Sequence, residues 1–191
     1  MVGLVGLGEI EKGVKMNTEE LRKYIRNVKD FPKQGIVFRD ITTLLLDSHA
    51  FHSAINLFLE ELKDKQFNKF AAIESRGFVF GGALANILEK GLILVRKPGK
   101  LPAETVKEEY ELEYGTDALE IHKDAVNPGD KVIVIDDLLA TGGTALSTCK
   151  LIEKLGGEIV CVAFLLELSF LNGRKKLEDY HVISFIDYKS E

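Results

Sequence analysis

The hydrophobic residues of this chain form short continuous runs that alternate with stretches of helical spacing. The continuous runs are candidates for buried strands, and they occupy residues 70–73, 92–95, 132–135, 159–166 and 182–186. Stretches in which apolar residues recur every three or four positions lie among them, at 48–62, 78–90 and 145–155, and Asp47 or Ser48 is expected to cap the first of these helices. Strands that alternate with helices predict an α/β fold, with one domain built on a mostly parallel sheet.

The pattern before residue 48 predicts a helix followed by an ordered loop. Asn17 or Thr18 is expected to cap the helix, whose apolar positions continue to Val28, and Pro32 ends it. Residues 30–43 mix proline, glycine and two phenylalanines without a regular period, which favours an ordered loop.

Residues 1–16 are rich in glycine and end on a second methionine. Gly6 and Gly8 begin a dinucleotide-type pattern, but Glu11 stands where the third glycine should be and no strand precedes it. We therefore expect residues 1–16 to be a leader or upstream extension that is poorly ordered, and the functional domain to span 17–191.

The most informative stretch is 132–144, where a buried strand leads into two acids and a turn of small residues. Asp136 and Asp137 follow four β-branched apolar residues. The turn that comes next has small or absent side chains, so several backbone N–H groups can point at one anion. The helical pattern that starts at this turn places it at a positive helix N-terminus. The unit is a strand, an acidic pair, an anion-binding turn and a helix.

Composition limits the class of partner. The chain has 191 residues, of which 46% are hydrophobic, and a formal net charge of −5, which disfavours nonspecific binding to nucleic acid or to an acidic membrane surface. No apolar run approaches the roughly 18–20 residues of a membrane span, and the N-terminus has no basic region of the signal-peptide type. Cys149 and Cys161 fall in a predicted helix and strand and are interpreted as small core residues. We expect a cytoplasmic protein.

Polar residues follow three of the predicted strands, at 74–77, 96–100 and 136–144. Ligands of parallel sheets lie beyond the carboxyl ends of the strands, so these segments are expected to meet there. The basic residues among them suit further phosphate, and they are Arg76, Arg96, Lys97 and Lys100. Acidic pairs often only cap turns, but this pair adjoins a phosphate-type turn. It can accept hydrogen bonds from sugar hydroxyls, and a Mg²⁺ held mainly by substrate and water fits beside it.

Two further segments are ambiguous from the residues alone. The run 101–115 is charged and carries five glutamates, which is typical of a solvated surface, although its length without a core pattern indicates a mobile lid. His49 and His52 lie three residues apart on one predicted helix. Since no third ligand is near, they are interpreted as surface or packing histidines.

Residues 132–144 resemble the phosphoribosyl pyrophosphate signature of the type I phosphoribosyltransferases. The other segments that carry a resemblance, in order and spacing, are 31–42, 74–81, 96–102 and 112–115. Together they are similar to the adenine phosphoribosyltransferase family over about residues 17–188, and only residues 1–15 depart from its pattern. The resemblance implies the type I fold, with an N-terminal hood at about 17–43 and a flexible lid at about 97–117.

The resemblance also implies a reaction and a set of site residues. The 5-phosphoribosyl group of 5-phosphoribosyl 1-pyrophosphate would pass to adenine with Mg²⁺ as cofactor, giving AMP and pyrophosphate in purine salvage. The residues implied for ribose 5-phosphate are Asp136, Asp137, Ala140, Thr141, Gly142, Gly143 and Thr144. Those implied for pyrophosphate are Ser75, Arg76, Lys97 and Lys100, with Arg76 also catalytic.

Base recognition and proton transfer are implied for other residues. Phe38 would stack on adenine, while backbone groups of Val37 and Arg39 would read its edge. Glu113 would act as general acid/base at N7 of the purine. From composition alone Phe38 is more typical of a core residue and Glu113 of a surface acid.

Other functions remain open at this point. A relative that uses hypoxanthine, guanine or xanthine would share the phosphate turn, and so would a non-catalytic regulator that senses phosphoribosyl pyrophosphate. A kinase or synthetase is disfavoured because the Gly-Lys-Ser/Thr of a P-loop is missing. The family works mostly as homodimers, which makes Arg96 a candidate to reach a neighbouring site.

Overall fold

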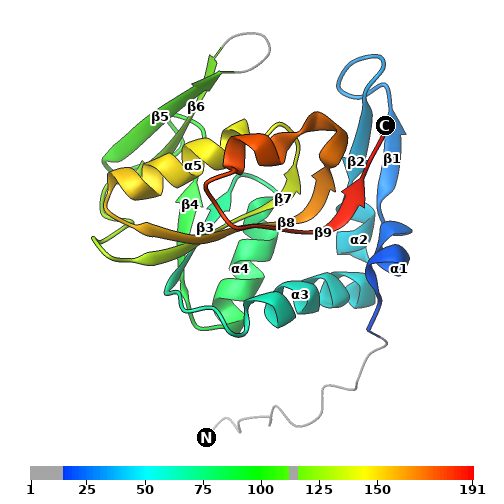
Figure 1. Cartoon of the computed structure of the whole chain (residues 1–191), viewed down its shortest axis with the longest axis horizontal. Helices are drawn as coiled ribbons and strands as arrows, with labels where there is room; N and C mark the ends of the chain where they lie inside the picture. The colour runs from blue at the N-terminus through cyan, green and yellow to red at the C-terminus, as the bar shows by residue number, and fades with distance from the viewer. Residues whose placement is uncertain (1–14, 112–115) are drawn as a thin grey trace, which may run out of the picture. The chain divides into compact units, whose positions relative to one another are not determined.

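The second part of the chain is built on a parallel sheet. The computed structural model describes residues 15–111 and 116–191 (Figure 1). Within these residues a five-stranded parallel sheet has the order β4-β3-β7-β8-β9. Its strands are β3 (Lys69–Ile73), β4 (Gly91–Val95), β7 (Lys131–Leu139), β8 (Glu158–Leu168) and β9 (Val182–Tyr188). The predicted α/β fold with a parallel sheet is confirmed.

Helices α4 (Gly77–Ile87) and α5 (Gly143–Lys154) cover opposite faces of this sheet (Figure 1). Gly81 of α4 lies against Ala72 of β3, whereas Ala71, its neighbour in the strand, belongs to the cluster that contains Cys149 of α5. Successive side chains of a strand point to opposite faces, so the sheet is buried on both. Both cysteines are buried, as predicted.

A charged hairpin packs against α5 in the same unit. Strands β5 (Thr105–Glu111) and β6 (Thr116–His122) pair antiparallel, and residues 112–115 between them lie outside the described residues. The charged run 101–115, in which the sequence showed no core pattern, therefore contains a strand at 105–111. Val106 and Tyr110 pack on the α5 core, so a strand with one apolar face lies within the charged run. The short 3₁₀ helices η1 (Ser169–Leu171) and η2 (Gly173–Leu177) follow β8.

The first part of the chain forms its own compact unit up to Asn56. It contains α1 (Thr18–Arg22), β1 (Arg26–Lys29), β2 (Val37–Asp40), α2 (Thr42–Leu46) and most of α3 (Ser48–Leu62), within which the second unit begins at Leu57. Asp47 caps α3 as predicted, because its Oδ1 accepts the N–H groups of His49 and Ala50 at 3.0 and 2.9 Å. His49 and His52 are exposed on this helix.

Two predictions for the first unit are wrong. The first helix ends at Arg22, and Val28 belongs to β1, where it pairs with Phe38 of β2. Asn17 does cap the helix, through a capping box with Glu20. Cross-strand pairing of β1 with β2 replaces the end of the predicted helix and residues 37–40 of the predicted loop, and α2 begins at Thr42. Residues 30–36 do form a loop.

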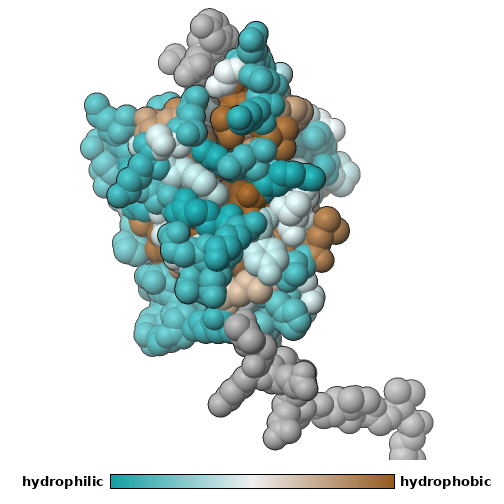
Figure 2. All heavy atoms as spheres, turned by 90° about the vertical axis from the view of Figure 1, so that its right-hand side faces the viewer, coloured by the Kyte–Doolittle hydropathy of each residue, from teal (hydrophilic) through white to brown (hydrophobic). Residues whose placement is uncertain are grey.

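The surface is predominantly hydrophilic on the face drawn in Figure 2, where hydrophobic residues form small separate patches. Among the residues that the structure describes, no helix is both long enough and apolar enough to cross a membrane.

Two adjacent glycines of α4 generate a stability prediction. A Cβ on Gly81 would lie 2.6 Å from Cβ of Ala72, whereas a Cβ on Gly82 would meet nothing within 4 Å. Gly81→Ala should therefore lower the free energy of unfolding by about 1–3 kcal/mol through overpacking. Gly82→Ala should raise it by roughly 0.5–1 kcal/mol, because alanine is the better helix former. Urea unfolding of the two variants measures both, and equal effects would contradict this packing.

Candidate active site

Three polar segments meet at the carboxyl end of the parallel sheet, as predicted. Two of them follow β3 and β4, and the third begins within the last part of β7. These three strands are adjacent in the sheet. A cleft of ≈ 400 Å³ opens there. It is lined by Glu74, Ser75, Arg76, Lys97, Tyr110, Leu119, Asp136, Asp137, Leu138, Ala140 and Thr144. Four of the residues implied for ribose 5-phosphate and three of those implied for pyrophosphate are therefore in one cleft.

The turn after β7 has the geometry of an anion site. Gly142 adopts φ +79° and is followed by α5, whose first hydrogen bond runs from the N–H of Leu146 to the carbonyl of Gly142 at 3.0 Å. The unpaired N–H groups at this helix start and the positive end of its dipole favour a phosphate. A smaller cavity of ≈ 80 Å³ lies at the turn, and Ala140, Thr141, Gly142 and Thr144 are among its lining residues.

A second loop supports this turn through backbone contacts. A Cβ on Gly142 would lie 2.5 Å from the carbonyl oxygen of Gly173, and a Cβ on Gly173 would lie 2.2 Å from the carbonyl oxygen of Ala140. The start of η2 therefore forms a wall of the phosphate turn. Gly173 was not predicted, since nothing in its local sequence indicates that a remote backbone lies at this distance.

The acidic pair lies in the last part of β7, which continues to Leu139. The Oδ1 of Asp136 accepts the N–H of Asp137 at 2.8 Å, and the Oδ2 of Asp137 is 3.0 Å from Nε of Arg76. Burial, reinforced by the charge of its neighbour, raises the pKa of Asp136 well above its usual value. Burial also raises the pKa of Asp137, although the Arg76 guanidinium acts in the opposite direction.

The donor set at the acidic pair suits Mg²⁺. Carboxylate oxygens are the hard ligands that this ion prefers, and the wide cleft leaves room for ligands that the protein does not supply. Within the described residues no group of three His, Cys, Asp or Glu side chains converges on one point. The residues present therefore fit an ion that takes most of its ligands from substrate and water.

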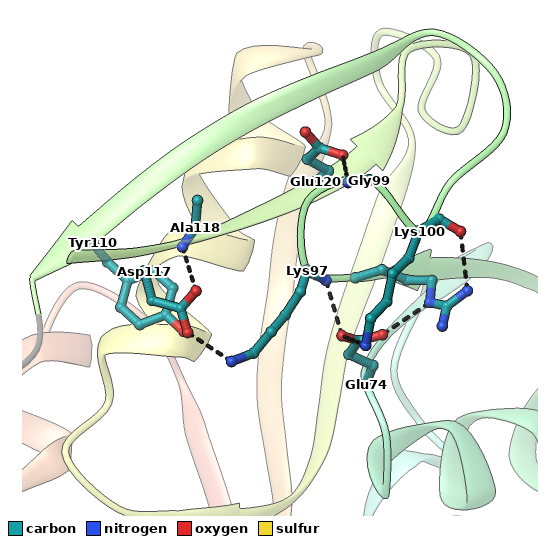
Figure 3. Close-up of polar contacts among 9 residues, drawn as sticks. Glu74, Lys97, Gly99, Lys100, Tyr110, Asp117, Ala118 and Glu120 are labelled. Atoms are coloured by element: carbon teal, nitrogen blue, oxygen red, sulfur yellow. Dashed lines mark hydrogen bonds and ion pairs between the residues drawn. The ribbon is translucent and has the colours of Figure 1, made fainter.

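Glu74 ties the loop after β3 to the basic turn after β4 (Figure 3). Its side chain is 7% exposed, and Oε1 accepts the backbone N–H of Lys97 at 3.0 Å and Nζ of Lys100 at 2.9 Å. Its Oε2 accepts Nε of Arg96 at 2.9 Å. Burial by itself would raise the pKa of Glu74, but these three donors outweigh it and lower the pKa, so this acid is a carboxylate at neutral pH.

The two lysines implied for pyrophosphate are placed differently. Lys97 lines the cleft, and its Nζ is 2.9 Å from Oδ2 of Asp117 (Figure 3). Lys100 is not among the cleft-lining residues in the described part of the chain, and its Nζ is held by Glu74. The peptide between Glu74 and Ser75 is cis. Glu74 and Asp117 were not predicted as site residues, because their ion-pair partners are at least twenty positions away in the sequence.

The residues implied for adenine lie in the first unit. Val37, Phe38 and Arg39 are consecutive in β2. The ring of Phe38 packs edge-on against Phe31, with centroids 5.2 Å apart, and Nη1 of Arg39 donates to Oδ1 of Asn27 at 2.6 Å. Glu113 lies outside the described residues.

Comparison with known proteins agrees with the fold. The model of the phosphoribosyl transferase domain family matches residues 42–190. Adenine phosphoribosyltransferase of Thermosipho melanesiensis is 54% identical over 92% of this chain and 100% of its own length.

Solved structures give the same result. The crystal structure of adenine phosphoribosyltransferase from Thermoanaerobacter pseudethanolicus has a TM-score of 0.88 at 54% identity, covering 90% of this chain and 100% of that one. The Saccharomyces cerevisiae enzyme, solved with an imino-altritol bisphosphate and adenine, has a TM-score of 0.83 at 39% identity, covering 88% and 98%. With a family model over most of its length and relatives of this similarity, the chain belongs to the adenine phosphoribosyltransferase family.

Proposed function

We propose that this chain transfers the 5-phosphoribosyl group of 5-phosphoribosyl 1-pyrophosphate to adenine, which gives AMP and pyrophosphate and salvages the purine. The observation that carries the proposal is the cleft in which a phosphate turn, a buried acidic pair and basic residues meet. Family membership supplies the substrate class, and the yeast relative was solved with adenine bound.

The sugar phosphate is assigned to β7 and the turn after it. The 5-phosphate takes the backbone N–H groups of residues 140–144, whose orientation is already fixed by the start of α5. Asp136 and Asp137 accept hydrogen bonds from the ribose hydroxyls. Because Arg76 pairs with Asp137, the residue that contacts the leaving group also holds the residue that contacts the sugar. This arrangement positions C1 of the ribose for displacement.

The leaving pyrophosphate is assigned to the other side of the cleft. As the bond to C1 breaks, negative charge grows on the pyrophosphate, and we assign its stabilisation to Ser75, Arg76, Lys97 and Lys100. The first three line the cleft, and Lys100 is held by Glu74. When bound, Mg²⁺ supplies additional positive charge to the pyrophosphate oxygens.

Base recognition is assigned to β2 and to the segment between β5 and β6. Phe38 stacks on adenine, backbone groups of Val37 and Arg39 read its edge, and Glu113 exchanges a proton at N7. These roles rest on the family resemblance of the two segments.

Assembly and location stay predictions. A homodimer is supported by large apolar side chains that remain exposed, namely Ile87 on α4 and Leu92 and Leu94 on β4. Arg96, predicted to reach a neighbouring site, pairs with Glu74 of its own chain in this structure. Cytoplasmic location is consistent with two buried free thiols.

The proposed reaction predicts a clear order of substrates. With Mg²⁺ and phosphoribosyl pyrophosphate, adenine should yield AMP far faster than hypoxanthine, guanine or xanthine yields product. Chromatography of the nucleotides together with a pyrophosphate-release assay measures this. Equal rates would favour a different purine specificity, and binding of phosphoribosyl pyrophosphate without turnover of any purine would favour a sensor.

The proposed roles of two acids predict different kinetic defects. Glu113→Ala should lower kcat by about 10²–10⁴-fold and leave the affinity for phosphoribosyl pyrophosphate nearly unchanged, because only proton transfer is lost. Asp137→Asn should raise the KM for phosphoribosyl pyrophosphate by roughly tenfold or more, since a charged acceptor of a sugar hydroxyl is lost. Glu109→Gln is the matched control, an exposed acid that pairs with Lys107 outside the cleft. A Glu113→Ala enzyme with wild-type kcat would refute the proton-transfer role.

The wall of the phosphate turn predicts an effect of a single methyl group. Gly142→Ala should raise the KM for phosphoribosyl pyrophosphate by at least about tenfold, because its Cβ collides with the carbonyl of Gly173 and displaces the turn. Gly129→Ala is the control. Gly129 has a similar positive φ of +84°, but a Cβ there meets nothing within 4 Å. Steady-state kinetics of both variants separate the collision from backbone strain, and matching KM values would show that the wall has no role.

A further inference from the structure

Two carboxylates pair with the two lysines of the turn after β4, and they differ in burial and in the groups that they bind. Glu74 has a side chain that is 7% exposed, and it binds a backbone N–H as well as two cationic side chains. Asp117 has a side chain that is 24% exposed, and the only part of Lys97 it binds is the ammonium group, on a side chain that is 54% exposed. Glu74 therefore fixes the backbone of the turn, whereas Asp117 holds one movable group.

The carboxylate that pairs with Lys97 does not line the cleft. Lys97 lines the ≈ 400 Å³ cleft, but Asp117 does not. Asp117 lines a separate, open cavity of ≈ 220 Å³ together with Pro98 and Lys107. In Figure 3 the Lys97 side chain extends from the turn toward Asp117 on β6. An anion in the cleft can therefore bind the ammonium group of Lys97 only if the ion pair between Lys97 and Asp117 breaks.

Asp117 has two other hydrogen-bond donors besides Lys97. Its Oδ1 accepts the N–H of Ala118 at 2.8 Å, and its Oδ2 also accepts the hydroxyl of Tyr110 at 3.2 Å. Both donors stay in place when Lys97 leaves, so the carboxylate remains hydrogen-bonded. Ion pairs between exposed side chains contribute little to stability, so a doubly or triply charged phosphate can compete with this one for the ammonium group.

We propose that Asp117 is a positioning residue that competes with pyrophosphate for Lys97 and thereby weakens binding of the pyrophosphate group. The proposal rests on the assignment of Lys97 to the pyrophosphate side of the cleft. Lys100 differs, because its ammonium is held by the buried Glu74 beside a second cation, so Lys97 is the lysine that an incoming ligand recruits. Release of the product is eased for the same reason, since Asp117 recaptures the ammonium.

The test is a gain of affinity, which a damaged fold does not produce. Isothermal titration of inorganic pyrophosphate in the presence of Mg²⁺ into the Asp117→Asn variant should give a Kd about two- to fivefold lower than that of the wild type. Asparagine keeps an acceptor for the N–H of Ala118. Glu109→Gln removes the same charge from the same hairpin without touching Lys97, and its Kd should match the wild type.

A double-mutant cycle assigns the effect to Lys97. In the Lys97→Ala background, Asp117→Asn should change the Kd by less than the error of the measurement, because the group for which the acid competes is gone. Unchanged or weaker binding in Asp117→Asn overturns the proposal, as does a gain that persists without Lys97 or that Glu109→Gln reproduces. Absence of pyrophosphate binding to the wild type overturns it too. Formation of AMP by the wild type, measured separately, decides the proposed function independently of these titrations.

Discussion

The register of β3 against its two neighbours is the constraint on which the cleft depends. Ile73 pairs with Val95 on one side, and Ala72 pairs with Ile135 on the other. The N–H of Glu74 continues this ladder to the carbonyl of Val95 at 2.9 Å. Because the strands are parallel and in this register, the residue after β3 meets the turn after β4, and Arg76 meets Asp137. A slip of one residue would turn every side chain to the other face and separate these pairs.

The sequence predicted those parts of the structure that local pattern decides. The strand, acidic pair and glycine turn of 132–144 are contiguous, and Asp47 caps α3 through neighbours two and three residues away. The helix predicted up to Val28 was wrong because the competing partner, β2, lies beyond an intervening loop. Strand β5 was missed because its two core-facing residues, Val106 and Tyr110, are separated by three charged residues and so show no period-two pattern. Site residues that contribute by contact with remote segments, such as Gly173 and Asp117, leave no local signal.

An acidic chain that binds a polyanion must concentrate its positive charge. The formal net charge is −5, yet Arg76, Arg96, Lys97 and Lys100 gather at one edge of the sheet. In the structure each of these cations is paired with Asp137, Glu74 or Asp117. These pairs offset most of the positive charge at this edge before a ligand binds, which reduces the repulsion among the four cations. If these cations bind phosphate as proposed, its affinity depends on which of the pairs open.

The turn at residues 140–144 is shaped by two segments of the chain, because Gly142 and Gly173 approach each other closely. Each glycine leaves room for the backbone of the other segment, with Gly173 facing Ala140 and Gly142 facing Gly173. Neither position can accept a side chain while the other segment stays where it is. A designer who varies only residues 140–144 to admit a different anion therefore explores a space already limited from outside. Useful variants require compensating changes, or altered loop length, in residues 169–177, so the two segments are best randomised together.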